Sequence, residues 1–381
     1  MKGRTVTHPI SSQTHTRHDL AEAVLEAHRA GLPGIIAEVV DHGEIVCECA
    51  GFAEVAAKTP MTPELHHRVG SIAKTFTTVT LLRLVEKGII DLDAPIGGYL
   101  PELVPGTRGE AITVRMLANH TSGLNEYLPV IYDSLRAFPN LAQTSPRSLI
   151  EQQFTRFDRR ELINIGVGAP PAGEPGGLPG RYSNTNYLLL AELIESVTGT
   201  SAEEHIRSEV IEPADLPDTY FPVGSVLAAA HTHLYESWFG MAGPPVDLTD
   251  CDMSWVGPAA SLVSTTADLN RFFGLLIDGQ LLRPESLEQM QSTVPVISFE
   301  GTTIEYGLGL HRRESDDGTV WWGHDGSVWG GGALTFTRAD TGKQVTVFTN
   351  RQRWNTLDES GRPQPHPIDA ALARVVTGSM G

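Results

Sequence analysis

The pattern of apolar and polar residues changes twice along the chain. Short β-branched and alternating runs, of the kind found in strands, occupy residues 34–58 near the N-terminus and residues 304–349 near the C-terminus. Between them, residues 92–250 alternate helical stretches with loops rich in proline and glycine. The pattern predicts an α/β (α+β) fold: an antiparallel sheet built from N- and C-terminal segments, flanked by helices, with a mostly helical lobe inserted.

Caps, terminators and tight turns predict the individual elements. A helix over 19–30 begins at the capping residue Asp19 and ends at Gly31. Further helices are predicted over 71–87, 184–197, 201–210, 268–277, 284–291 and 368–376. Strands are predicted over 34–40 and 44–49, which a tight turn joins into a hairpin, and over 304–310, 319–323, 332–337 and 344–349.

These elements assign the chain to one domain over 18–381, preceded by an arm over 1–17 that we expect to be flexible. We expect an α/β lobe over about 18–75 and 257–381, and a helical lobe over about 76–256.

The net charge of -18 over 381 residues disfavours a nucleic-acid or anionic-membrane partner, because phosphate groups attract lysine and arginine. The three cysteines, Cys47, Cys49 and Cys251, are too few and too irregularly spaced for a disulfide framework or a zinc ribbon. We therefore predict free thiols and no cofactor. The oligomeric state stays open.

The N-terminal residues contain no apolar run of the roughly 7–15 residues that a secretory signal needs. No apolar run approaches the roughly 20 residues of a membrane span. The sequence as written therefore predicts a cytoplasmic protein.

Candidate chemistry begins at Ser71, which follows a glycine and precedes an apolar-periodic run. Lys74 stands three residues later, so on a helix the two side chains share one face. A helix N-terminus also supplies free backbone N–H groups. Such a pair can form an acyl-enzyme, in which serine attacks and lysine takes its proton. The alternative is a capping serine with a surface lysine, since short motifs also arise by chance.

Two further motifs follow in order, Tyr182-x-Asn184 and His324-x-Gly326, each beside a predicted turn. Tyr182 could simply pack, Asn184 could cap the next helix, and His324 could be structural. The three motifs together are much more specific than any one of them.

With these motifs the chain resembles the serine β-lactamase/penicillin-binding-protein superfamily over nearly its whole length. It is most similar to the class C-type branch, which includes Streptomyces-type D-alanyl-D-alanine carboxypeptidases, related esterases and D-amino-acid amidases. The resemblance extends to the segments 68–71 (RVGS), 91–94 (DLDA), 120–124 (HTSGL), 182–187 (YSNTNY), 264–269 (STTADL) and 306–310 (YGLGL).

The resemblance implies a role for each motif residue. Ser71 would be the nucleophile, and Lys74 would be its base or would assist Tyr182 in that role. Tyr182 would shuttle protons, and Asn184 would hold both Lys74 and the substrate amide. His324, in the place other branches give to lysine, would help polarise Tyr182.

The resemblance also implies a substrate-binding surface around the third motif. The backbone N–H groups of Ser71 and Ser327 would form the oxyanion hole, and Asp325, Gly326 and His311 would face the substrate. An acid at Asp325 would repel a substrate carboxylate by roughly a kcal/mol or more, unless it points away from the cleft. His311 stands at the position where the resemblance to carboxypeptidases implies a carboxylate-binding arginine.

We therefore expect a serine hydrolase or acyltransferase that carries the acyl group of an amide or ester on Ser71. The acceptor would be water, an amine or an alcohol. Asp325 and the absent leader favour an intracellular transacylase of secondary metabolism. The alternatives are a D-alanyl-D-alanine carboxypeptidase or β-lactamase-type hydrolase, and a non-catalytic binding protein on the same fold. We predict no metal, because the pairs His66-His67 and His231-x-His233 lack a neighbouring Glu or Cys ligand.

Overall fold

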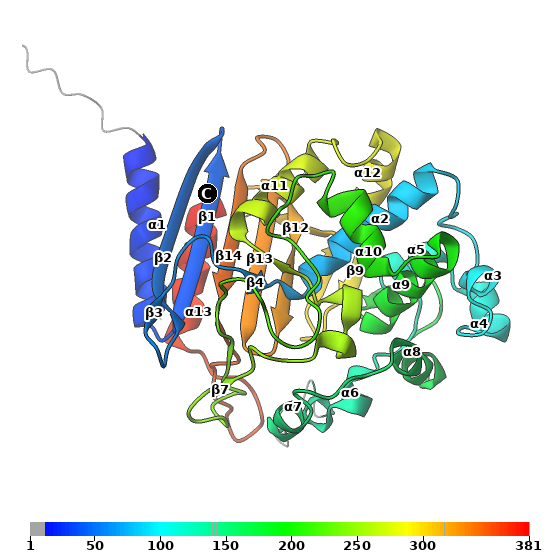
Figure 1. Cartoon of the computed structure of the whole chain (residues 1–381), viewed down its shortest axis with the longest axis horizontal. Helices are drawn as coiled ribbons and strands as arrows, with labels where there is room; N and C mark the ends of the chain where they lie inside the picture. The colour runs from blue at the N-terminus through cyan, green and yellow to red at the C-terminus, as the bar shows by residue number, and fades with distance from the viewer. Residues whose placement is uncertain (1–11, 137, 139–140, 142–143, 316, 381) are drawn as a thin grey trace, which may run out of the picture.

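The computed structural model describes residues 12–136, 138, 141, 144–315 and 317–380. These residues form a fold that contains a ten-stranded sheet (Figure 1). Its strands are β1 (Gly34–Asp41), β2 (Glu44–Glu54), β3 (Thr59–Pro60), β5 (Gly180–Arg181), β9 (Val294–Ile297), β10 (Thr303–Tyr306), β11 (His311–Glu314), β12 (Val320–Val328), β13 (Gly331–Arg338) and β14 (Gln344–Thr349). Their order is β3-β2-β1-β14-β13-β12-β11-β10-β9-β5. The paired strands are antiparallel, except that β5 runs parallel to β9.

The predicted fold class is confirmed, because the N-terminal strand β1 pairs with β2 on one side and with the C-terminal strand β14 on the other, in one sheet. The predicted hairpin is present as well. His42 and Gly43 both adopt positive φ angles of 49° and 81° between β1 and β2, which is the backbone that a two-residue hairpin turn requires.

Alternate residues of β1 separate the two faces of the sheet. Ile35 and Ala37 pack with α1 (Ser12–Arg29) and α13 (Pro367–Met380) in one apolar cluster. Ile36 points to the other face and joins the larger cluster, which also contains residues of α2 and α11. Helix α1 begins at Ser12, so residues 12–17 of the predicted arm are helical. Residues 1–11 of that arm lie outside the described residues.

The helices of the middle region lie to the right of the sheet and, for α6 and α7, below it in Figure 1. They are α2 (Ala73–Glu86), α3 (Ile96–Tyr99), α4 (Gly106–Ala111), α5 (Val114–Ala118), α6 (Leu128–Ile131), α7 (Arg147–Glu151), α8 (Arg159–Gly168), α9 (Asn184–Thr198) and α10 (Ala202–Ile206). Helices α11 (Thr266–Ile277) and α12 (Pro284–Gln291) follow, and short strands complete the chain: β4 (His67–Arg68), β6 (Tyr235–Glu236), β7 (Val246–Asp247), β8 (Val263–Ser264) and β15 (Arg351–Gln352).

The predicted single strand over 304–310 is wrong. Strand β10 ends at Tyr306, Gly309 takes a φ of +62°, and the Gly307 N–H donates to the Leu310 carbonyl oxygen at 2.8 Å. This tight turn reverses the chain, and His311 opens the new strand β11 beside β12. The turn places the His311 side chain next to the third motif.

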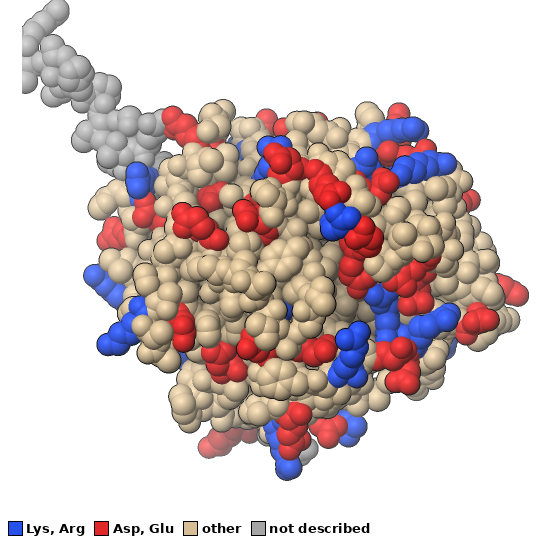
Figure 2. Space-filling model, viewed as in Figure 1, with Lys and Arg blue, Asp and Glu red and all other residues tan. Residues whose placement is uncertain are grey.

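Charged side chains of both signs are scattered around a largely uncharged centre on the face shown in Figure 2, and lysine and arginine form no continuous basic surface there. Among the helices of the described residues, none combines the length and the apolar character that crossing a membrane requires.

Candidate active site

Ser71 lies in a 3-10 helix, Gly70–Ile72, that leads directly into α2. Its Oγ is 3.0 Å from the Lys74 Nζ. Helical spacing therefore places serine and lysine within hydrogen-bond distance, as the sequence predicts.

Lys74 is completely buried. Its Nζ is 2.8 Å from Asn184 Oδ1 and 3.1 Å from the Ala259 carbonyl oxygen, in addition to Ser71 Oγ. Burial lowers the pKa of Lys74 to about 7, and the negative charge of Glu126 opposes this shift. The amine is therefore partly neutral near neutral pH, which is the state a general base needs.

Tyr182 and Asn184 stand at the junction of β5 and α9. The Tyr182 N–H donates to the Ile297 carbonyl oxygen at 3.0 Å, and Lys74 Nζ lies 5.0 Å from the centre of the Tyr182 ring. Among the described residues, no hydrogen bond of ordinary geometry reaches the buried Tyr182 hydroxyl. Burial raises the pKa of Tyr182 well above its usual value, although the nearby Ser71 side chain opposes the rise. Tyr182 is therefore a neutral phenol near pH 7.

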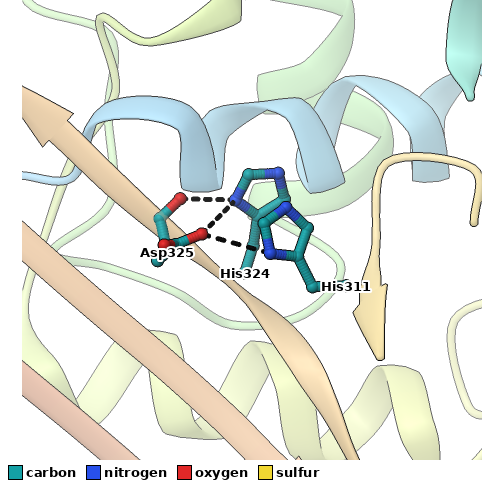
Figure 3. Close-up of side chains that lie close together, drawn as sticks. All are labelled: His311, His324 and Asp325. Atoms are coloured by element: carbon teal, nitrogen blue, oxygen red, sulfur yellow. Dashed lines mark hydrogen bonds and ion pairs between the residues drawn. The ribbon is translucent and has the colours of Figure 1, made fainter. Parts of the chain in front are cut away.

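His311, His324 and Asp325 converge on the opposite side of the cleft (Figure 3). His311 Nδ1 is 3.2 Å from Asp325 Oδ1, and Arg313 Nη2 is 3.5 Å from the other carboxylate oxygen. Burial would raise the pKa of Asp325, but His311 and Arg313 outweigh it and hold the pKa below its usual value. The Asp325 side chain is 48% exposed and borders the cleft, so it does not point away.

Hydrogen bonds fix the tautomer of His324. Its Nδ1 bonds to the carbonyl oxygen of Asp325, which can only accept, so Nδ1 bears the proton. Its Nε2 then accepts from the Tyr306 hydroxyl at 3.1 Å. His324 thus faces Tyr306, whose ring packs edge-on against Tyr182 with centroids 5.9 Å apart. An influence of His324 on Tyr182 would pass through Tyr306.

The same three side chains could in principle ligate a metal, because their ligand atoms lie within 4.8 Å of one another. However, the proton on His324 Nδ1 and the bond to its Nε2 occupy both nitrogens. Arg313 adds a positive charge beside Asp325. The donor set therefore forms a hydrogen-bonded network that does not suit a cation.

Two glycines allow the nucleophile loop to touch β12. A Cβ at Gly70 would lie 2.5 Å from the Ser327 nitrogen, and a Cβ at Gly326 would lie 2.0 Å from the Val69 carbonyl oxygen and 2.9 Å from the Ser71 nitrogen. Gly70 also needs its φ of +58°. The close approach brings the backbone N–H groups of Ser71 and Ser327 to the same end of the cleft.

The cleft has a volume of about 460 Å³. Of the nine predicted site residues, eight line it, and Lys74 lies buried beneath Ser71: the eight are Ser71, Tyr182, Asn184, His311, His324, Asp325, Gly326 and Ser327. Aromatic walls come from Trp255 and Trp329, which stack with centroids 4.9 Å apart, and from Phe299. The three motifs therefore meet around one largely apolar cavity.

Two residues of this region were missed by the sequence reasoning: Glu126 and Tyr306. Glu126 contacts Asn184 across 58 positions of sequence, which no local spacing reveals. Tyr306 belongs to the quoted segment 306–310, and this was the one available signal. Arg313 shares a face of β11 with His311, which follows only once the strand is known to start at His311.

Several known proteins are similar to this chain. The human mitochondrial serine beta-lactamase-like protein LACTB is 41% identical over 70% of this chain and 60% of its own length. A D-aminopeptidase of Gluconobacter oxydans is 27% identical over 84% of this chain and 55% of its own length. The chain thus spans little more than half the length of these two curated relatives.

Among solved structures, a D-stereospecific amidohydrolase from Streptomyces superposes with a TM-score of 0.78 and 28% identity, covering 95% of this chain and 98% of that one. The predicted superfamily and the expectation of an enzyme are both confirmed. The sequence profile of the beta-lactamase family matches residues 20–368, and the chain belongs to this family.

Proposed function

We propose that the protein is a serine hydrolase that cleaves an amide or ester through an acyl-enzyme on Ser71. The main support is the contact of 3.0 Å between Ser71 Oγ and the buried Nζ of Lys74, whose pKa is lowered to about 7. A nucleophile and a base at hydrogen-bond distance, with the base held by further groups, is the arrangement that activates a serine.

Lys74 is the better candidate for the base in the acylation step. Its amine can be neutral near pH 7, whereas the Tyr182 phenol stays protonated because burial raises its pKa. Tyr182 can instead donate a proton to the leaving group. The two groups have opposite protonation states at the same pH, which suits an acid and a base in one site.

The proposed reaction consists of two acyl transfers, the first to Ser71 and the second to the acceptor. Lys74 takes the Ser71 proton, Ser71 Oγ bonds to the substrate carbonyl carbon, and the N–H groups of Ser71 and Ser327 hold the oxyanion. The scissile C–N or C–O bond then breaks, and the leaving group takes a proton through Tyr182, which Lys74 replenishes. Water, an amine or an alcohol then gives a proton to Lys74 as it attacks the ester carbonyl. The bond between the acyl carbon and Ser71 Oγ breaks, and Oγ takes that proton from Lys74.

Among substrates, we favour amides of D-configured amino acids. The names of two relatives, a D-aminopeptidase and a D-stereospecific amidohydrolase, support this choice. The cleft supports it as well, because its aromatic walls suit an apolar side chain. A D-alanyl-D-alanine carboxypeptidase is the second candidate. The negative charge of Asp325 disfavours the carboxylate of such a substrate, whereas the adjacent positive charge of Arg313 favours it.

The acceptor is the open part of the proposal. Trp255 and Trp329 make one wall of the cleft apolar, and a cleft that excludes water favours transfer to an amine over hydrolysis. A transacylase role in secondary metabolism would therefore appear as a product partition that moves toward the amide when an amine is added.

The test is intact-mass detection of the acyl-enzyme with D-amino-acid amides, p-nitrophenyl esters and a β-lactam, followed by peptide mapping. We expect a single adduct on Ser71 that is absent in Ser71→Ala. A folded wild-type protein that none of the three probes labels would contradict the proposal and favour a non-catalytic binding protein.

A further inference from the structure

Glu126 lies behind Asn184, on the segment between α5 and α6. Its Oε2 accepts from the Asn184 backbone N–H at 2.7 Å and from the Asn184 Nδ2 at 3.1 Å, and its Oε1 accepts from the Leu128 N–H at 3.1 Å. Three N–H donors point at the two carboxylate oxygens and, together with the positive charge of Lys74, oppose the rise that burial gives the pKa of Glu126. Glu126 is not among the residues that line the cleft.

These bonds decide which way the Asn184 amide faces. With Nδ2 on Glu126, Oδ1 points to the Lys74 Nζ at 2.8 Å. The reversed amide would set Oδ1 against the Glu126 carboxylate, and two acceptors repel each other. Glu126 therefore selects one of the two amide orientations.

The orientation matters because a neutral amine has two N–H groups and one lone pair. Lys74 has three neighbours: Asn184 Oδ1, the Ala259 carbonyl oxygen and Ser71 Oγ. The two carbonyl oxygens can only accept, so they take the two N–H groups and leave the lone pair toward the Ser71 hydroxyl. A reversed Asn184 would instead donate into the lone pair and block proton transfer from Ser71.

We propose that Glu126 is a positioning residue, which orients Asn184 so that the neutral Lys74 directs its lone pair at Ser71. The inference rests on the proposed function, since it concerns the same proton transfer. It differs from a substrate-binding role, because Glu126 acts through Asn184 and contacts neither Ser71 nor a substrate.

Electrostatics supply a second, separable effect. The ionisable groups around Lys74 are Glu126, Tyr182, Tyr187, and the histidines His120, His311 and His324. Burial lowers the pKa of His311 to about 4 and the pKa of the other two histidines well below the usual value, and burial raises the pKa of both tyrosines. The three histidines and both tyrosines are neutral near pH 7, whereas ionised Glu126 raises the pKa of Lys74 against the effect of burial.

The experiment compares two substitutions in the full chain, with kcat/KM for a p-nitrophenyl ester measured from about pH 5 to about pH 9. E126Q keeps the reach of the side chain and removes its charge. E126D keeps the charge and withdraws the oxygens from Asn184. Glu192→Gln is the matched control: its side chain is only 13% exposed, it lies on α9 as Asn184 does, and it pairs with Arg159 and Arg160 away from the cleft.

We expect both variants to lose on the order of tenfold to a hundredfold in kcat/KM, part of the roughly 10²–10⁴ that a positioned base contributes. In E126Q we expect the limb of the pH profile near pH 7, which reports the ionisation of Lys74, to move to lower pH, because the negative charge near Lys74 is removed. In E126D that charge remains, so the position of the limb should not change. The control changes neither quantity.

The outcomes separate the inference from the proposed function. Melting temperatures identify a variant that is merely unfolded. If E126Q is unfolded, the kcat/KM of E126D alone tests the positioning role. A folded variant with kcat/KM within about twofold of the wild type would overturn the positioning role while leaving the nucleophile intact. A fluorophosphonate that fails to label Ser71 in the wild-type protein would overturn both.

Discussion

The cleft has two walls that hold charged groups differently: a helical wall formed by the starts of α2 and α9, and a strand wall formed by β11 and β12. On the helical wall, Lys74 is fully buried and its pKa is lowered to about 7. On the strand wall, Asp325 is about half exposed and already balanced by His311 and Arg313. Burial on the helical wall lowers the pKa of an amine, while His311 and Arg313 on the strand wall hold the pKa of a carboxylate below its usual value. The helical wall is therefore suited to proton transfer and the strand wall to selecting the charge of the substrate.

Removing the nucleophile should give the largest effect. Ser71→Ala leaves the Lys74 amine without a proton donor, and we expect kcat/KM for any substrate to fall on the order of 10⁴-fold or more. Steady-state rates and intact-mass labelling measure this loss. Ser208→Ala is the control, since its exposed hydroxyl donates to the His205 carbonyl oxygen three residues earlier. Substantial turnover by Ser71→Ala would mean that the helical wall does not perform the chemistry.

The contact between the two walls should give the next largest effect. In Gly326→Ala the new methyl group would lie 2.0 Å from the Val69 carbonyl oxygen, so the backbone around Ser71 must shift. We expect a loss of about 1–3 kcal/mol in the free energy of unfolding, as for other overpacked sites, together with weaker acylation.

Thermal denaturation and the rate of acyl-enzyme formation test that expectation. Gly378→Ala serves as the matched control, because the same methyl group on α13 meets nothing within 4 Å. Its stability should stay unchanged or rise slightly, since alanine favours a helix over glycine. Equal stability and acylation in the two variants would show that the walls do not need their close approach.

The pH dependence of kcat/KM should show a smaller difference between the two walls. Burial lowers the pKa of Lys74 to about 7, so the neutral amine is lost as pH falls below that value. We expect kcat/KM to fall about tenfold per pH unit below the midpoint and to level off above it. A midpoint near pH 4 would assign the limb to the strand wall instead, because burial lowers the pKa of His311 to about 4.

The two walls also differ in how far the sequence predicts them. Ser71 and Lys74 are three residues apart on one helix, and Tyr182 and Asn184 flank one helix start, so local periodicity is enough to pair them. The contact of 2.8 Å between Lys74 and Asn184 joins residues 110 positions apart and follows only from the family resemblance.

The strand wall depends on a turn that the pattern hides. Apolar residues continue through Leu308 and Leu310, so residues 304–310 look like one strand, yet Gly309 reverses the chain. Because β11 starts at His311, the pairing of His311 with Gly323 places its ring beside His324 and Asp325. Side-chain partners of this kind depend on strand register, which apolar periodicity does not determine.

The smallest effect should come from Asp325, and it tests the role of the strand wall directly. Asp325→Asn removes one negative charge at the cleft. Two unit charges about 4 Å apart interact by about 1 kcal/mol in water, and His311 and Arg313 already offset part of this field. We expect a few-fold rise in kcat/KM for a substrate that bears a carboxylate, a similar fall for one that bears an amine, and no change for a neutral ester. Glu314→Gln is the control, since its side chain is exposed to a similar degree, 50%, and pairs with Arg312 outside the cleft lining. If Asp325→Asn changes all three substrates equally, the carboxylate acts by orienting His311 and His324, and the strand wall belongs to the catalytic machinery instead of to substrate selection.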